Sequence, residues 1–267
     1  SMDINGKVAV VTGGSSGMGK ATIRRVVKKG GKAAVFDIND EKGNNLVEEL
    51  GADNVIYCHV DVMDTASIEA GIAKVMDAFG AIHICCNFAG GGFGGPARTM
   101  GREGPHNIEN YKKTIMLNLV GTFDVARLCA EQMAKNVPFD KYSGRGVIIN
   151  TASVAGYEGQ IGQAAYASAK AGIIGLTVPV ARDLAVLGIR VNTIVPGLIA
   201  TPMLLRGAEE MTPEIEDRLQ PLSSQVLYPK RLGLADEIAS LAQHMMENDY
   251  INAESVRMDG GIRMQPK

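Results

Sequence analysis

Short apolar runs alternate with longer amphipathic stretches along most of the chain. The short runs are often β-branched, which is typical of strands buried on both faces of a sheet. The longer stretches repeat their apolar positions at helical spacing, which is typical of helices that cover a core. The pattern predicts strands at 7–12, 32–36, 54–60, 82–86, 146–150, 189–195 and 255–258. It predicts helices at 17–29, 40–50, 65–79, 108–135, 163–187 and 236–247.

The regular alternation of strand and helix indicates the α/β class. Such alternation implies a parallel sheet whose crossover helices wind right-handedly over both faces. We therefore expect a single doubly wound domain of the Rossmann type over residues 2–267, with a seven-stranded, mostly parallel sheet. Ser1, which precedes Met2, is expected to be a remnant of a cleaved expression tag. The stretch 91–117 is longer than a strand-to-helix link needs and is interpreted as an insertion near the substrate.

Composition excludes several classes of partner. With 267 residues, 46% of them hydrophobic, the chain can bury a large core. The formal net charge is −2 and no basic block occurs, so we expect neither nucleic acid nor an anionic membrane as the main partner. No apolar run approaches the roughly 20 residues needed to span a bilayer. The N-terminus shows no signal or transit segment, so a cytoplasmic location is expected.

The cysteines and histidines do not form a recognisable metal site. The four cysteines lie in apolar strand-like or helical runs, where buried, reduced thiols are expected. The four histidines are scattered without ligand spacing, so we expect no metal. The residues concerned are Cys58, Cys85, Cys86, Cys129, His59, His83, His106 and His244.

A glycine-rich turn joins the first predicted strand to the first helix. Its glycines, Gly13, Gly17 and Gly19, are spaced Gly-x-x-x-Gly-x-Gly. Glycines at such a turn let the backbone approach a pyrophosphate, which the free N–H groups of the following helix stabilise. A tight connection without a ligand is the alternative. The position of this turn, after the first strand, favours nucleotide binding.

An acidic residue ends the second predicted strand. The carboxylate of Asp37 can accept from the ribose 2′-hydroxyl of an adenosine and would repel a 2′-phosphate, so NAD is favoured over NADP. A solvated turn aspartate or a helix cap is the alternative. Asp61 follows the third strand and 87–90 the fourth, where the adenosine half of a dinucleotide should lie.

A hydroxyl, a phenol and an amine converge near the fifth strand. Ser153 follows that strand, and Tyr166 and Lys170 lie four residues apart on the next predicted helix, so they share one face. An unperturbed tyrosine titrates near pH ~10 and needs a positive charge nearby to act as an acid/base at neutral pH. The set fits proton transfer at an alcohol or ketone carbon. An ordinary surface pair is the alternative for Tyr166 and Lys170.

Taken together, these motifs resemble the short-chain dehydrogenase/reductase family over nearly the whole chain. They are Thr12-Gly13-x-x-x-Gly17-x-Gly19, Asn87-x-Ala89-Gly90, Asn118, Ser153, Tyr166-x-x-x-Lys170 and Pro196-Gly197.

The resemblance implies a role for each matching residue. Tyr166 would be the acid/base, Lys170 would hold the nicotinamide ribose and lower the pKa of Tyr166, and Ser153 would orient the carbonyl. Asn118 would hold the water of a proton relay. The implied cofactor contacts are Ser16 and Met18 at the phosphates, Asp37 at the ribose, Asp61 and Val62 at the adenine, Phe88 at the adenosine, and Ile199 and Thr201 at the carboxamide. Gly13, Gly17, Gly19, Asn87, Ala89, Gly90, Pro196 and Gly197 complete that site.

A narrower similarity is to the type 2 3-hydroxyacyl-CoA dehydrogenases, also called 17β-hydroxysteroid dehydrogenases type 10. It rests on 147–155, 158–160, 162–166, 179–185, 231–233 and 258–266. The insertion at 91–117 also fits that group, in which it is associated with coenzyme A substrates. The region 200–220 would be the substrate lid, and its part 206–220 departs from that group. Arg98, Arg102 and Gln163 are the candidate substrate-binding residues.

Three functions remain open at this point. The first is an NAD-dependent oxidoreductase that interconverts 3-hydroxyacyl-CoA and 3-ketoacyl-CoA. The second is a hydroxysteroid or other secondary-alcohol dehydrogenase, which the same residues would serve. The third is a nucleotide-binding structural subunit with vestigial activity, against which the intact Ser153, Tyr166 and Lys170 argue. The family resemblance also implies a homotetramer.

Overall fold

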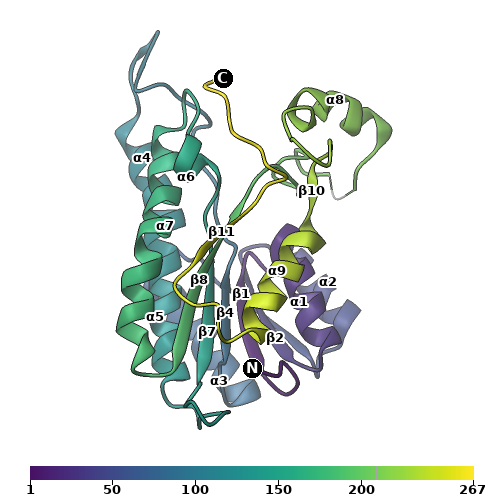
Figure 1. The fold of residues 1–267 in the computed structure, drawn as a ribbon, viewed down its shortest axis with the longest axis vertical. Coiled ribbons are helices and arrows are strands. Elements are labelled where there is room, and N and C mark those ends of the chain that lie inside the picture. Colours follow the sequence, from purple (N-terminus) through teal and green to yellow (C-terminus); the bar gives the residue numbers. More distant parts are fainter. Residues whose placement is uncertain (209) are drawn as a thin grey trace.

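The computed structural model describes residues 1–208 and 210–267. Within them, seven parallel strands form one sheet in the order β11-β8-β7-β4-β1-β2-β3 (Figure 1). The predicted α/β fold is therefore confirmed, and the sheet is parallel throughout. Its strands are β1 (Val8–Thr12), β2 (Lys32–Asp37), β3 (Val55–His59), β4 (Ile84–Asn87), β7 (Gly146–Thr151), β8 (Ile189–Pro196) and β11 (Ser255–Met258).

Helices cover both faces of the sheet. One layer comprises α1 (Gly17–Lys28), α2 (Asp40–Leu50) and α9 (Ala235–Glu247). The opposite layer comprises α3 (Thr65–Phe79), α5 (Gly121–Met133) and α7 (Ala164–Ala185). The remaining helices, α4 (Ile108–Ile115), the π-helix η1 (Met116–Val120), α6 (Ala155–Glu158) and α8 (Pro213–Ser223), lie in the connections.

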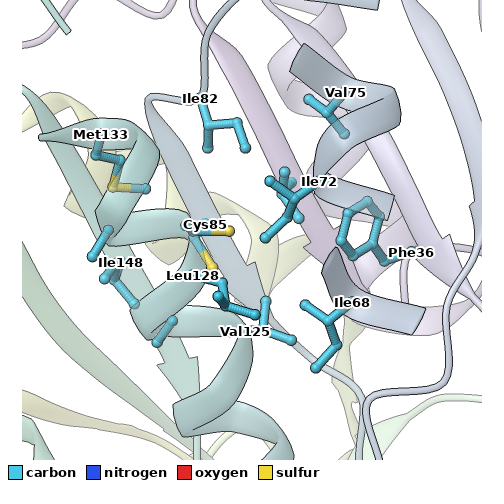
Figure 2. Packing of buried hydrophobic residues seen from close by; sticks show 14 of the residues in the cluster. Phe36, Ile68, Ile72, Val75, Ile82, Cys85, Val125, Leu128, Met133 and Ile148 are labelled. Carbon is cyan, nitrogen blue, oxygen red and sulfur yellow. The ribbon is translucent and has the colours of Figure 1, made fainter. Parts of the chain in front are cut away.

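The central strands β1, β4 and β7 are mostly apolar because both of their faces are buried. In β1, Val8 and Val10 belong to one core, while Ala9 and Val11 belong to the other. Figure 2 shows the first core, in which Phe36 of β2 lies beside Ile68 and Ile72 of α3, while Val125 and Leu128 of α5 belong to the same cluster. Burial of these apolar groups, at ~25 cal/mol per Å², is the dominant favourable term in such a fold.

The connections hold elements that the hydrophobic pattern did not predict. The insertion contains the antiparallel strands β5 (Met100–Gly101) and β6 (Gly104–Pro105), and the lid region contains α8. The parallel pair β9 (Ile199–Ala200) and β10 (Gly233–Leu234) closes the base of the lid. The long helix predicted at 108–135 is divided by η1.

The order of the strands places the ligand-binding edge. From β1 the chain proceeds to β2 and β3 on one side, and then returns to β4, β7, β8 and β11 on the other. Open α/β sheets bind ligands at the carboxyl ends of their strands where this reversal occurs. The insertion, the lid with α8 and the C-terminal tail all lie at one end of the molecule (Figure 1).

Helix α7 is unusually apolar for a helix with an exposed face. Within the described residues it is the one helix long and apolar enough, by length and composition, to cross a membrane. It packs on β8 and α6 instead, and one third of its most apolar window is buried. The remaining face, which includes Val178 at 40% exposure, is open.

The four cysteines are buried and free, as expected. Burial raises the pKa of the Cys58 thiol to about 11, so this thiol stays protonated at neutral pH. No group of His, Cys, Asp and Glu that could hold a metal ion occurs within residues 1–208 and 210–267.

We predict that Ile148→Ala lowers the free energy of unfolding by ~2–5 kcal/mol, because the cavity left in a packed core adds to the lost transfer energy. Ile148 is 0% exposed at the centre of the sheet. Val137→Ala is the matched control, since Val137 is 86% exposed. Its effect should stay within ~0.5 kcal/mol in the same urea titration. Equal effects of the two changes would contradict this account of the core.

Candidate active site

Ser153, Tyr166 and Lys170 meet at the carboxyl end of β7. Ser153 lies just beyond the strand, where its hydroxyl accepts a hydrogen bond from the Ala155 N–H at 3.1 Å and bonds the Tyr166 hydroxyl. Lys170, one turn along α7, places its Nζ 5.6 Å from the centre of the Tyr166 ring. Its ammonium donates to the Thr151 carbonyl at 3.1 Å. The helical spacing predicted from the sequence thus places Tyr166 and Lys170 on one face of α7, and the end of β7 brings Ser153 to them.

Burial shifts the pKa values of the phenol and the amine in opposite senses. Burial raises the pKa of Tyr166 above its ordinary 10, and the hydrogen bond from Ser153 acts the other way. Burial lowers the pKa of Lys170 to about 8, because Lys170 is 4% exposed and desolvation penalises its charged form. The resemblance implied a lowered pKa for Tyr166. In the protein alone burial outweighs any such effect, so the phenol is protonated at neutral pH and can act as an acid.

Asn118 lies in η1 and is fully buried. Its side-chain amide makes two hydrogen bonds to the backbone of Gly91: it accepts one from the N–H at 3.0 Å and donates one to the carbonyl at 2.6 Å. It also donates to the Thr114 carbonyl at 2.8 Å. The Asn118 side chain therefore ties the first residue of the insertion to the helix. The predicted water-holding role stays a prediction.

The turn between β1 and α1 has the shape of a phosphate cradle. A Cβ on Gly13 would lie 2.9 Å from the Ala89 backbone nitrogen, and a Cβ on Gly19 would collide with the Gly13 carbonyl. Ser16 is the N-cap of α1 but its side chain makes no capping hydrogen bond, and the first turn contains no acid. Free N–H groups at such a helix end favour an anion. These residues fit the pyrophosphate of a dinucleotide.

Asp37 is fixed at the end of β2 beside this turn. Its carboxylate accepts from the Ser15 N–H and from the Asn39 N–H, each at 3.1 Å. This fixed, partly exposed carboxylate fits the predicted ribose contact. The Asp61 carboxylate accepts a hydrogen bond from the Met63 N–H at 2.9 Å, within the turn that follows β3. Val62, between these two residues, is buried.

A polar ladder crosses three strands beneath the site. Thr12 of β1 donates to Asn87 of β4 at 3.4 Å, and Asn87 donates to Asn150 of β7 at 2.9 Å. Thr12 also accepts from the Ala89 N–H at 3.2 Å. Asn87 and Ala89 thus fix the end of β4 against the glycine-rich turn.

A cavity of about 290 Å³ lies between Ser153, Tyr166 and Lys170, the predicted lid region and the C-terminal tail. The predicted site residues on its wall are Met18, Phe88, Gly90, Ser153, Gln163, Tyr166, Lys170, Pro196, Gly197, Ile199 and Thr201. Met203 and Leu204, from the predicted lid region 200–220, are also on the wall. Sequence reasoning did not single out Val154 and Met264, two further apolar wall residues, because neither belongs to a chemical motif.

The candidate arginines of the insertion lie away from this cavity. Arg98 is exposed and borders a second cavity, of about 370 Å³, whose wall includes Gln160 and Gln163. Arg102 is exposed in the turn between β5 and β6. Gln163 borders both cavities, so the second one opens beside the first.

The fold and this site define the class of the protein. The family model of the short chain dehydrogenases matches residues 7–211. The chain therefore belongs to the short-chain dehydrogenase family and is an oxidoreductase, as the sequence indicated.

Individual proteins within this family are similar to the chain over nearly its whole length. The chain is 42% identical to the human protein named 3-hydroxyacyl-CoA dehydrogenase type-2, over 98% of this chain and 97% of that one. It is 41% identical to the Drosophila melanogaster protein of the same name, over 98% and 100%. A crystal structure of 3-hydroxyacyl-CoA dehydrogenase type-2 from Mycobacterium avium superposes with a TM-score of 0.89 at 40% identity, covering 100% of both chains.

We predict that Tyr166→Phe binds NADH with nearly unchanged affinity but loses ~10²–10⁴-fold in turnover, the range for a positioned acid/base. The phenol hydroxyl is the proton-bearing group that faces Ser153 in this cavity. Fluorescence titration measures binding and NADH absorbance measures turnover. Near-normal turnover in the Phe variant would show that another group carries the proton.

The pH dependence of ketone reduction should follow the deprotonation of the Lys170 ammonium. A lysine is cationic below its pKa and neutral above it, so the ammonium is lost as the pH rises through about 8. Tyr166 remains protonated there because its pKa lies above 10. We therefore expect kcat/KM for NADH in ketone reduction, which reports the enzyme before the cofactor binds, to fall as the pH rises through about 8. Lys170→Arg should remove that fall in any activity it retains, since arginine stays charged. A flat wild-type profile would contradict this assignment.

Proposed function

We propose that the protein is an NAD-dependent oxidoreductase that interconverts 3-hydroxyacyl-CoA and 3-ketoacyl-CoA. The observation that carries the proposal is an assembled Ser153, Tyr166 and Lys170 set in a chain about 42% identical, end to end, to proteins named for that activity. The apolar wall of the cavity, which includes Val154, Leu204 and Met264, supports an acyl substrate. A structural subunit without activity would have no need for the three catalytic side chains together.

Each catalytic side chain has a defined task in this reaction. A bound nicotinamide nucleotide supplies the hydride for ketone reduction or accepts it in alcohol oxidation. Tyr166 gives its proton to the substrate oxygen in reduction and takes one in oxidation. Ser153 donates a hydrogen bond to the same oxygen and holds it near the phenol. Lys170 supplies positive charge beneath the phenol, which favours the phenolate formed when the proton leaves.

NAD is the proposed cofactor on the strength of Asp37. Its carboxylate stands beside the glycine-rich turn, held by two backbone N–H groups. In that position it would accept from a ribose 2′-hydroxyl and repel a 2′-phosphate.

A homotetramer is the proposed assembly. Met116, Val120 and Phe123 are exposed on η1 and α5, and Val178 is exposed on the neighbouring helix α7. Exposed apolar faces of this kind mark sites of association. The apolar composition of α7 is thereby explained by a partner subunit that covers the helix.

A substrate comparison tests the proposed function. Purified protein is assayed with NADH and acetoacetyl-CoA, a 3-ketosteroid and a 17-ketosteroid in parallel. The proposal requires acetoacetyl-CoA to have the largest kcat/KM. Higher kcat/KM on either steroid would favour the hydroxysteroid alternative, and absence of turnover on all ketones would favour a structural subunit.

Replacement of Asp37 tests the cofactor. We predict that Asp37→Ala weakens NADH binding and reduces discrimination against NADPH, because the repelling charge and the ribose acceptor are both removed. The ratio of kcat/KM for NADH and NADPH is the measurement. A wild-type enzyme that already prefers NADPH would show that Asp37 is not at the ribose.

The arginines of the insertion test the coenzyme A contact. We predict that Arg98→Ala/Arg102→Ala raises KM for acetoacetyl-CoA severalfold, and more at low salt, because exposed charge contacts are screened. KM for a small ketone without coenzyme A should be unchanged, and kcat should change little since the contact is remote from the reaction.

The matched control is Lys135→Ala/Lys141→Ala, which removes two exposed cations beyond α5, near the amino end of β7. It should leave KM for both ketones unchanged. An equal rise in KM for both ketones in the arginine variant would mean that the arginines serve the fold.

A further inference from the structure

The C-terminal tail forms one wall of the catalytic cavity. After β11 the chain turns back toward α6, on the side of the sheet that carries the site (Figure 1). Ile262 is 0% exposed and packs with Val154 in a small apolar cluster. Met264 is half-buried, packs against the same cluster and faces the cavity. A residue near the end of the chain thus stands opposite Tyr166 and the lid residue Leu204.

Glu158, at the end of α6, fastens this tail. One oxygen of its carboxylate accepts from the Arg257 guanidinium at 2.6 Å, and the other accepts from the Met264 backbone N–H at 2.7 Å. Arg257 is itself held by Asp259 at 2.7 Å. The Glu158 and Arg257 side chains are 20% and 22% exposed, so solvent screens this pair less than a surface pair.

The tail also bonds the loop that leads into α7. The Ile161 N–H donates to the Pro266 carbonyl at 2.9 Å, and the Gln160 side chain donates to the Gln265 carbonyl at 2.8 Å. This loop continues into Gln163 and then Tyr166. The tail, the loop and the start of the catalytic helix therefore form one hydrogen-bonded unit.

From these contacts we infer that Met264 sets the depth of the acyl site and that Glu158 is a positioning residue that holds Met264 there. The inference rests on the proposed function, because it concerns which acyl chains the cavity accepts. Methionine is unbranched and flexible, so it fills an apolar pocket while its removal opens space for additional methylenes. The tail is held by backbone and charge-assisted hydrogen bonds, so its position depends on the carboxylate of Glu158.

Changes of size at Met264 test the first half of the inference. The ratio of kcat/KM for 3-ketodecanoyl-CoA to that for acetoacetyl-CoA should rise about tenfold in Met264→Ala, a typical effect of one or more methylenes in an apolar pocket. The ratio should fall in the larger Met264→Phe. An unchanged ratio in both variants overturns the inference while leaving the proposed function intact. A wild-type enzyme that reduces neither thioester overturns both.

Removal of the charge on Glu158 tests the second half. Glu158→Gln should raise KM for acetoacetyl-CoA severalfold and raise the chain-length ratio in the same direction as Met264→Ala, with KM for NADH unchanged. Glu48→Gln, an exposed change on α2, should alter none of these. If Glu158→Gln lowers Tm but leaves KM and the ratio at their wild-type values, Glu158 serves only stability and its positioning role is wrong.

Discussion

The site depends on the burial of one ammonium group. Lys170 is 4% exposed beneath Tyr166, and its Nζ donates to the Thr151 carbonyl at the end of β7. Withdrawing an ammonium from water is costly, and the cost appears as a pKa lowered to about 8. Further acceptors, such as the ribose hydroxyls of a dinucleotide, would reduce that cost. The same burial that makes Lys170 costly in the protein alone therefore makes the site receptive to its cofactor.

Other hydrogen bonds fix the backbone segments around this ammonium. The sheet aligns the ends of β1, β4 and β7 through the ladder of Thr12, Asn87 and Asn150. Across the site, Asn118 ties the insertion to η1. The strand ends thus position Ser153 and the glycine-rich turn, while the lid region and the tail add apolar side chains such as Leu204 and Met264 to the wall of the cavity. This division explains how one catalytic set can serve different substrates within a family.

Sequence reasoning found the parts whose physical signal is local. The central strands are mostly apolar runs, and Tyr166 and Lys170 are one helical turn apart, so both features could be recognised without knowledge of the fold. The π-turn at η1 was missed because it accompanies the contact of Asn118 with Gly91, which lies 27 residues away in the chain. The contribution of the C-terminal tail to the cavity wall was missed because the hydrogen bond between Met264 and Glu158 joins residues 106 positions apart. No periodicity in the sequence marks that contact.

The central claim is that this site reduces a 3-ketoacyl thioester by direct hydride transfer coupled to the proton of Tyr166. The most direct test is mass spectrometry of the product formed from acetoacetyl-CoA and NADH dideuterated at C4. The account predicts one deuterium on C3 of 3-hydroxybutyryl-CoA with the wild-type enzyme, and almost no labelled product with Tyr166→Phe. Product without the label, or equal labelling by both enzymes, would contradict it.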